Sequence, residues 1–169
     1  MKEYKKHIFL IGMMGSGKSA VAKELASILN YDLIDLDQRI VEKYGKSIER
    51  IFLEEGEIVF RGYEAETARA LKISDPAVIA TGGGFPVRTE NRRWMKKTGK
   101  VVWLKCNPGL ILERIKNEDR PLLPKPISVE HLENILNGRT HIYTQADMII
   151  NTDRLTPKEA AKKIKSMIK

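Results

Sequence analysis

The sequence lacks features that several classes of protein require. Its 169 residues include one cysteine, Cys106, which excludes an internal disulfide and a cysteine-built metal site. No apolar run approaches the roughly 20 residues that cross a bilayer, and the start "MKEYKKHIFLIG" has too short an apolar region for a signal peptide. No repeat, low-complexity segment or linker divides the chain. These absences predict one soluble, cytoplasmic domain over residues 1–169, with no membrane contact.

The histidines and the net charge bear on two further classes of function, zinc binding and nucleic-acid binding. His7, His131 and His141 show no metal-ligand spacing, so we expect no zinc site. The formal net charge is +8, and much of the excess lies in scattered lysines and in the C-terminal "KEAAKKIKSMIK". There the lysines alternate with apolar residues, as on the solvated face of an amphipathic helix. We therefore expect no nucleic-acid partner, and positive potential also suits an enzyme with anionic substrates.

Short apolar runs alternate with helical patterns along the chain. The runs predict strands at 7–11, 32–36, 77–81, 101–105 and 148–151. The patterns predict helices near 18–29, 57–72, 89–97, 108–117 and 130–140, and a last helix from 157. Thr156 and Glu159 form a capping box at the start of that last helix. Strands that alternate with helices, with few hairpin signals, favour a parallel sheet covered on both faces.

A glycine-rich stretch, "GMMGSGKS" at 12–19, lies between the first expected strand and the first expected helix. Its glycines let backbone N–H groups form an anion-binding cradle, and the helix adds the positive end of its dipole. Lys18 can reach the β- and γ-phosphates, and the Ser19 hydroxyl can ligate Mg²⁺. The stretch predicts binding of ATP or GTP by Gly12, Gly15, Ser16, Gly17, Lys18, Ser19 and Ala20.

The phosphate loop does not identify the acceptor, and two acidic residues at the end of the second expected strand are candidates for it. Asp35 and Asp37 lie where open α/β sheets bind ligands, and the two-residue period of a strand could point both carboxylates into one cleft. One could help to hold Mg²⁺ through water, and the other could bind an acceptor hydroxyl and take its proton. Solvated acids that cap the next helix are the alternative.

Two further stretches are candidates for the acceptor pocket. In "EEGEIVFRGYEAE", Arg61 and Glu64 share a helix face, so the carboxylate can orient the guanidinium for a bidentate grip on a substrate carboxylate. In "VIATGGGFPVR", Gly82, Gly83 and Gly84 directly follow an expected buried strand, which favours a close approach of the backbone to a ligand. The alternatives are a surface ion pair and a flexible turn.

A proline-rich segment interrupts the alternation near residue 120. The stretch "NEDRPLLPKP" at 117–126 has three prolines and four charges, which resist both helix and strand. It predicts a mobile loop, with Arg120 as the cation that reaches a bound ligand.

Taken together, these motifs resemble the shikimate kinases. The P-loop, "DLD", "FRGYE", "TGGG", "RPLL" and a late arginine and tyrosine, Arg139 and Tyr143, come in the order and spacing of that family over nearly the whole chain. The resemblance implies a P-loop NTPase fold, a three-layer α/β/α domain with a five-stranded parallel sheet. It also implies a shikimate-binding segment at about 35–62 and a mobile lid at about 114–126.

The resemblance also implies a reaction: transfer of the γ-phosphoryl of ATP to the 3-hydroxyl of shikimate, with Mg²⁺ required. It is a step of aromatic amino acid biosynthesis. Asp37 would bind the shikimate hydroxyls and act as the base, Asp35 would reach the Mg²⁺ indirectly, and Arg61 and Arg139 would grip the shikimate carboxylate. The remaining implied site residues are Gly82, Gly83 and Gly84 in the pocket, Lys18 and the lid residue Arg120 on the phosphates, and Arg114 and Arg154 on the adenine.

Two positions depart from the family pattern. Ala146 follows Tyr143 by three residues instead of four, and Asn151 stands where an aspartate is expected. A kinase for another polyol acid, such as gluconate, is one rival function, and a nucleotide-binding regulatory or nucleic-acid-binding protein is another. No exposed apolar stripe remains unassigned, so we expect a monomer.

Overall fold

The computed structural model describes residues 6–71, 75–118 and 123–168. Its centre is one five-stranded sheet in the order β2-β3-β1-β4-β5, and all four neighbouring pairs are parallel. The strands are β1 (His7–Ile11), β2 (Asp32–Asp35), β3 (Ala77–Ala80), β4 (Gly99–Lys105) and β5 (Met148–Asn151). This confirms the predicted parallel sheet. The second strand ends one residue early because Leu36 begins a helix.

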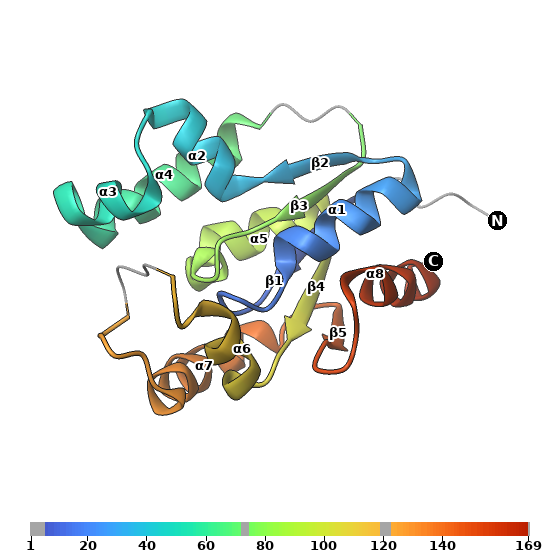
Figure 1. Cartoon of the computed structure of the whole chain (residues 1–169). Coiled ribbons are helices and arrows are strands. Elements are labelled where there is room, and N and C mark those ends of the chain that lie inside the picture. The colour runs from blue at the N-terminus through green and yellow to red at the C-terminus, as the bar shows by residue number, and fades with distance from the viewer. Residues whose placement is uncertain (1–5, 72–74, 119–122, 169) are drawn as a thin grey trace.

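Helices cover both faces of the sheet (Figure 1). They are α1 (Lys18–Leu29), α2 (Leu36–Tyr44), α3 (Ile48–Glu54), α4 (Gly56–Ala70), α5 (Thr89–Thr98), α6 (Pro108–Ile115), α7 (Val129–Tyr143) and α8 (Pro157–Met167), with a 3₁₀ turn, η1, at Phe85–Val87. Thr156 and Glu159 form the predicted capping box of α8. Within the described ranges no helix is long and apolar enough to span a membrane.

The alternation of side chains along the strands produces two cores. In β1, Ile8 and Leu10 join one cluster with Leu25 of α1 and Ile164 of α8. Phe9 and Ile11 point the other way, into a cluster with residues of α5, α6 and α7. Each face of the sheet is therefore buried under its own helices, as the three-layer prediction required.

The sequence pattern predicted no helix between β2 and α4, although the family resemblance implied a helical shikimate-binding segment there. This segment forms α2 and α3, which pack with α4 around a small core of Ile40, Ile51 and Phe60. Ser47 begins α3 by accepting a hydrogen bond from Arg50 N. α2 buries Leu36 in the core under the sheet, but Ile40 of α2 and Ile51 of α3 are buried among the short helices. In Figure 1 they lie beyond the carboxyl ends of β2 and β3, opposite α6 and α7.

Candidate active site

The phosphate loop lies at the carboxyl end of β1 and forms a tight turn. Gly12 and Gly15 have φ of 145° and 71°, which side-chain-bearing residues rarely adopt. A Cβ on Gly12 would stand 2.6 Å from Leu104 O, and one on Gly15 would stand 2.7 Å from a methyl of Ile115. The loop therefore requires glycine for conformation and for space. Gly17, at φ 91°, leads directly into α1.

The polar side chains of the loop turn toward its own backbone. Lys18 Nζ donates to the carbonyl oxygens of Gly12 at 3.1 Å and Met13 at 2.8 Å. The Ser16 hydroxyl is buried and has no hydrogen-bond partner among the described residues. Ser19 and Ala20 are exposed in the first turn of α1. This arrangement leaves the start of α1 open to an anion.

Asp35 ends β2 and makes two kinds of contact. Its Oδ2 accepts a hydrogen bond from the Ser19 hydroxyl at 2.6 Å. Its Oδ1 caps α2, accepting from Asp37 N at 3.1 Å and Gln38 N at 3.3 Å. The functional and capping interpretations of Asp35 are therefore compatible. The two adjacent oxygens, a hydroxyl and a carboxylate beside the phosphate loop, are the donor set that suits Mg²⁺.

The prediction that strand alternation orients both aspartates was wrong. Asp37 belongs to the first turn of α2, so the helix, and not the period of the strand, places its side chain. It reaches a pocket at the carboxyl end of the sheet. The pocket is lined by Met14, Asp37, Ile48, Phe52, Phe60, Arg61, Glu64, Gly82, Gly83, Gly84 and Arg139.

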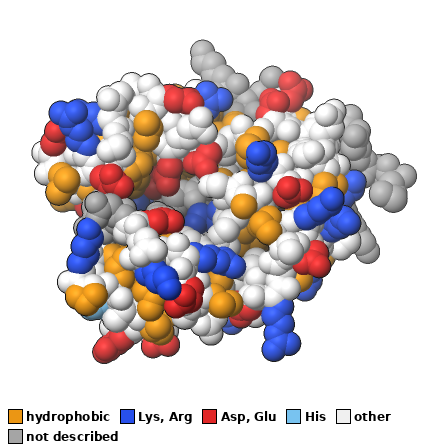
Figure 2. All heavy atoms as spheres, viewed as in Figure 1, with side chains coloured by type: hydrophobic (Ala, Val, Ile, Leu, Met, Phe, Trp, Pro, Cys, Tyr) orange, Lys and Arg blue, Asp and Glu red, His pale blue; other side chains and the backbone are white. Residues whose placement is uncertain are grey.

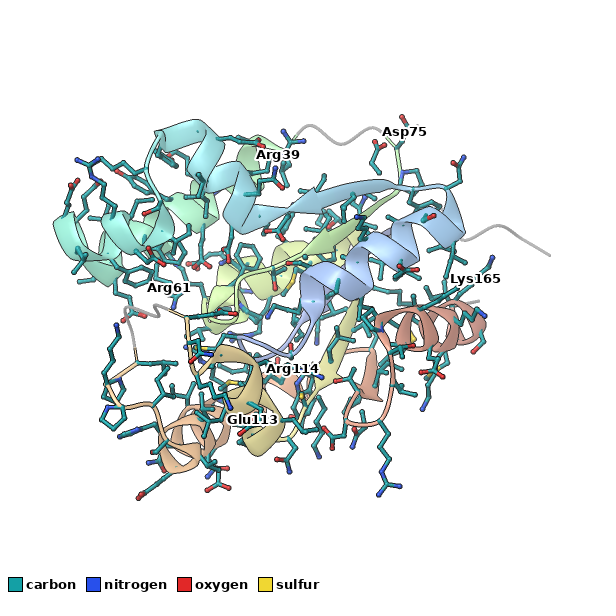
Figure 3. The ribbon with its side chains drawn as sticks, viewed as in Figure 1. Arg39, Arg61, Asp75, Glu113, Arg114 and Lys165 are labelled. Atoms are coloured by element: carbon teal, nitrogen blue, oxygen red, sulfur yellow. The ribbon has the colours of Figure 1, made fainter. Side chains whose placement is uncertain are left out.

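Arg61 is held from both sides on α4. Its Nη1 donates to Glu64 Oε2 at 2.7 Å, and its Nη2 donates to Glu57 Oε1 at 3.1 Å. Its guanidinium also lies 5.3 Å from the centre of the Phe60 ring. The predicted pairing of Arg61 with Glu64 is confirmed, and Glu57 is an additional partner. Figure 3 shows Arg61 on the inner side of α4, whereas Arg39, Asp75 and Lys165 lie at the edges of the molecule.

Glu64 is the most deeply buried charged group of the pocket. Its side chain is 1% exposed. The pKa of this carboxyl is raised from 4.5 to about 7, chiefly because the group is buried. Arg61 and Arg139 oppose the rise, and the neighbouring Asp37 carboxylate adds to it. The site therefore contains a carboxyl that changes its charge near neutral pH.

The triple-glycine turn after β3 passes between these side chains. A Cβ on Gly82 would stand 2.6 Å from Glu64 Oε1 and 3.0 Å from Asp37 Oδ1. One on Gly84 would collide with the guanidinium of Arg61. The closest approach is thus to charged side chains of the protein, and a larger residue at either position would have to displace them.

Gly83 joins the acceptor pocket to the phosphate loop. Its carbonyl accepts a hydrogen bond from the buried Tyr143 hydroxyl at 2.6 Å. A Cβ on Gly83 would stand 3.3 Å from Gly12 O and from Met14 N, and 3.6 Å from Arg139 Nη1. That Arg139 nitrogen is buried and has no hydrogen-bond partner among the described residues. Arg139, from α7, therefore faces the same pocket as Arg61.

The pattern did not reveal the apolar wall of the pocket. Ile48 and Phe52 of α3 line it together with Phe60 of α4, and Phe52 lies 4.5 Å from Phe60 between ring centres. The available signal was Ser47, a good N-cap directly before the apolar spacing of α3. In Figure 2, acidic and basic side chains meet in a hollow between the α2–α4 side and the α6–α7 side.

The predicted adenine residues differ in position. Arg114 of α6 donates to Gly15 O at 3.0 Å, so it lies against the phosphate loop, whereas Arg154 is exposed in the turn after β5. Asn151 Oδ1 accepts from Asp153 N at 2.9 Å, a bond that an aspartate oxygen would also accept. Arg120 lies outside the described residues.

A phosphate loop at the end of β1, followed by an acidic strand end and a pocket with two arginines, defines a P-loop kinase of a small anionic molecule. The shikimate kinase family model matches residues 14–169. A shikimate kinase of Sulfurihydrogenibium sp. is 41% identical over 165 residues, covering 97% of this chain and 98% of that protein. One of Bacillus mycoides is 40% identical over 164 residues, covering 96% and 98%.

Comparison with solved structures gives the same family. A shikimate kinase from Acinetobacter baumannii in complex with shikimate superposes with a TM-score of 0.92 at 34% identity, covering 98% of this chain and 94% of that chain. A gluconokinase from Sinorhizobium meliloti, at 17% identity and a TM-score of 0.61, shares the fold alone and covers 99% and 95%. The chain belongs to the shikimate kinase family and is an ATP-dependent kinase of that family.

Proposed function

We propose that the residues assembled at this site transfer the γ-phosphoryl of ATP to the 3-hydroxyl of shikimate, the activity of the family. The observation that carries the proposal is the shared wall: Gly83 lies between the phosphate loop and Arg139 of the acceptor pocket. An acceptor held in this pocket is therefore adjacent to a phosphate held by the loop, and positioning of this kind supplies much of the catalysis in phosphoryl transfer.

Two arginines bind the carboxylate of the acceptor. Arg61 and Arg139 reach the pocket from α4 and α7, and the planar, bidentate fork of a guanidinium group fits the shape of a carboxylate. Ile48, Phe52 and Phe60 pack against the ring of the acceptor. Arg139 Nη1 is buried and has no hydrogen-bond partner among the described residues. This supports the assignment, because an oxygen of the ligand would accept a hydrogen bond from it.

Asp37 binds the hydroxyl that reacts. The hydroxyl oxygen forms a bond to the γ-phosphorus while the bond from that phosphorus to the β–γ bridging oxygen breaks. The hydroxyl proton passes to the Asp37 carboxylate, and ADP leaves. Asp37 Oδ1 is buried beside the Gly82 turn. This burial helps to exclude water, which would otherwise compete as the acceptor.

The phosphate half of the site stabilises the charge that develops. Backbone N–H groups of 12–17, the start of α1 and Lys18 bind the phosphates. Ser19 and Asp35 would hold Mg²⁺, directly and through water, and the bound ion would neutralise charge on the phosphate oxygens. Arg120 stays a prediction as the residue that closes over the phosphates.

The segment boundaries, the oligomeric state and the cellular location of the protein are also part of this proposal. Residues of about 35–62 form the shikimate-binding segment and residues of about 114–126 the lid. The enzyme acts as a cytoplasmic monomer without nucleic-acid or membrane partners. Sedimentation equilibrium at working concentrations tests the monomer: a mass near 19.3 kDa is expected, and a doubled mass contradicts it.

The first test measures ADP release from ATP by a coupled assay, with Mg²⁺ and with or without shikimate. We expect release that requires both shikimate and Mg²⁺, and that stops when EDTA is added. Gluconate is the control acceptor, since a gluconokinase shares the fold. ATP binding without shikimate-dependent release would overturn the proposal, and turnover with gluconate would assign a different acceptor.

Asp37→Asn tests the base. The amide keeps the shape and can still bind a hydroxyl, but it takes no proton. We expect kcat to fall by about 10²-fold or more while the shikimate KM changes little. Full turnover by Asp37→Asn would remove Asp37 as the base.

A further inference from the structure

Glu64 has one oxygen that the proposed mechanism does not use. Its Oε2 accepts from Arg61 Nη1 at 2.7 Å, but its Oε1 is buried and has no hydrogen-bond partner among the described residues. This Oε1 faces the triple-glycine turn, 2.6 Å from where a Cβ of Gly82 would stand. A buried carboxylate oxygen without a donor is unfavourable, whereas a neutral carboxyl there carries its own proton.

The charged groups around Glu64 come from three helices. Arg61, which also binds Glu57, lies on α4, Asp37 lies on α2, and Arg139 lies on α7. In the substrate-free pocket the carboxylates of Asp37 and Glu64 face the two arginines, so the charges inside the pocket balance. A substrate carboxylate adds a third negative charge to the same two arginines. Removing one negative charge restores the balance.

We propose that Glu64 takes up a proton when shikimate binds. Arg61 then pairs with the carboxylate of the substrate in place of an ionised Glu64. The inference rests on the proposed function. Neutral Glu64 keeps its place beside Arg61 through Oε2, so the guanidinium stays oriented while its charge serves the substrate. Glu64 is thus a positioning residue whose charge depends on occupancy.

The direction of the proton movement follows from the electrostatics. In the free site the Glu64 pKa is about 7, so at pH 7.5 the ionised form predominates. A bound anion on Arg61 and Arg139 disfavours that form and raises the pKa. Binding then takes a proton from solvent at pH 7.5, and takes none at pH 5.5, where Glu64 is already neutral.

Titration calorimetry tests this uptake. Shikimate is titrated into the enzyme at pH 7.5 in phosphate and in Tris, whose ionisation enthalpies differ. The difference in binding heat should correspond to an uptake of about 0.5 to 0.8 proton per shikimate bound, and the uptake should fall toward zero at pH 5.5 in a pair of buffers that hold that pH. Equal heats in the two buffers, with normal affinity, would overturn the inference and leave the proposed function standing. No binding and no shikimate-dependent turnover would overturn both.

Two substitutions locate the proton. Glu64→Gln should bind shikimate without proton uptake, and its Kd should stay constant from pH 6 to 8.5, where the wild-type Kd should weaken by up to about tenfold per pH unit. Glu57→Gln is the matched control, because Glu57 contacts the same arginine but is half-exposed, and it should keep the wild-type uptake. Unchanged uptake in Glu64→Gln would contradict the assignment.

A measurement on the wild-type chain covers the case in which Glu64→Gln does not fold. Carboxyl ¹³C NMR with labelled glutamate follows each Glu titration with and without shikimate. A resonance that titrates near pH 7 and moves to higher pH on adding shikimate supports the proposal. A set of glutamate titrations that shikimate leaves unchanged overturns it.

Discussion

The two halves of the site are built in opposite ways. The phosphate loop is one contiguous stretch whose backbone makes the proposed binding surface, and even its Lys18 side chain bonds to backbone carbonyls. The acceptor half is made of side chains from α2, α3, α4 and α7, and most of them are charged or aromatic. The phosphate half is therefore specified by local conformation, and the acceptor half by contacts that form only when the chain folds.

This difference corresponds to a difference in what each half can recognise. Backbone N–H groups and a helix start recognise any phosphate, so such a loop serves many kinases. In the proposed function, the acceptor half recognises one molecule through the balance of Arg61 and Arg139 against Asp37 and Glu64, which line the same pocket. Substitutions should therefore separate cleanly: those in the first half should affect ATP and turnover, and those in the second should affect shikimate.

The largest effect is expected from Lys18→Met. Loss of a positive charge at the transferred phosphate should lower kcat by about 10³-fold, while shikimate affinity measured by calorimetry stays near wild type. Lys23→Met, on an exposed position of the same helix, is the control and should retain full activity. A kcat within tenfold of wild type would mean that Lys18 does not act on the phosphates.

Glu64→Gln should change how stability depends on pH. The Glu64 pKa is about 7 in the folded chain and 4.5 in the reference state, so folding favours the protonated form. That stabilisation is complete below about pH 4.5 and is lost as pH rises through 7, on the order of 3 kcal/mol in total. The variant should lack this loss, so its unfolding free energy relative to wild type should increase between pH 5 and 8.

Urea unfolding at several pH values measures this difference. Glu57→Gln is the matched control, because that side chain is half-exposed and contacts the same arginine. A difference between Glu64→Gln and wild type that stays constant across the range would contradict the raised pKa. It would also mean that Glu64 is not the group whose protonation sets the charge of the acceptor half.

Arg61→Ala tests the carboxylate grip. We expect the shikimate KM to rise by about 100-fold and the ATP KM to stay within twofold, because a buried charge pair and a substrate contact are lost together. Arg50→Ala is the control: Arg50 also pairs with a glutamate four residues away, but its side chain is 65% exposed, so steady-state kinetics should not change. An unchanged shikimate KM in Arg61→Ala would show that Arg61 does not bind the substrate carboxylate.

The contrast between the halves also explains how much the sequence predicted. The phosphate loop, the five strands and the capping box of α8 depend on residues close in sequence, and the structure confirms them. Arg61 and Glu64 are three residues apart on one helix, so their pairing was equally accessible. Local spacing carries these features because the interactions form within a few turns of chain.

The missed features depend on distant packing. α2 and α3 are short and become stable by burying Ile40 and Ile51 against α4, so propensity alone does not mark them. Without those helices Asp37 was assigned to a strand, and the apolar wall of Ile48 and Phe52 was not foreseen. The depth of Glu64, which sets its charge, likewise depends on Gly82 and α7, more than 15 residues away in sequence.

Gly84→Ala should produce a smaller effect confined to the acceptor half. Gly84 has helical backbone angles that alanine accepts, but its new Cβ would displace the guanidinium of Arg61. We expect the chain to fold and the shikimate KM to rise by about tenfold, the scale of a misplaced binding group. Gly62→Ala, within α4 and with nothing within 4 Å of its Cβ, should leave KM unchanged and stabilise the helix by about 0.5–1 kcal/mol. Equal KM values in the two variants would contradict the steric argument.

The smallest effect distinguishes the two candidate adenine residues. Arg114 bonds to Gly15 O and so connects α6 to the phosphate half, whereas Arg154 is exposed in the turn after β5. Loss of one such hydrogen bond corresponds to about 1 kcal/mol, so Arg114→Ala should raise the ATP KM about fivefold, and Arg154→Ala should change it less than twofold. Both variants should keep the wild-type shikimate KM. The reverse order would place the adenine against the turn after β5, and a change in shikimate KM would show that the two halves are not independent.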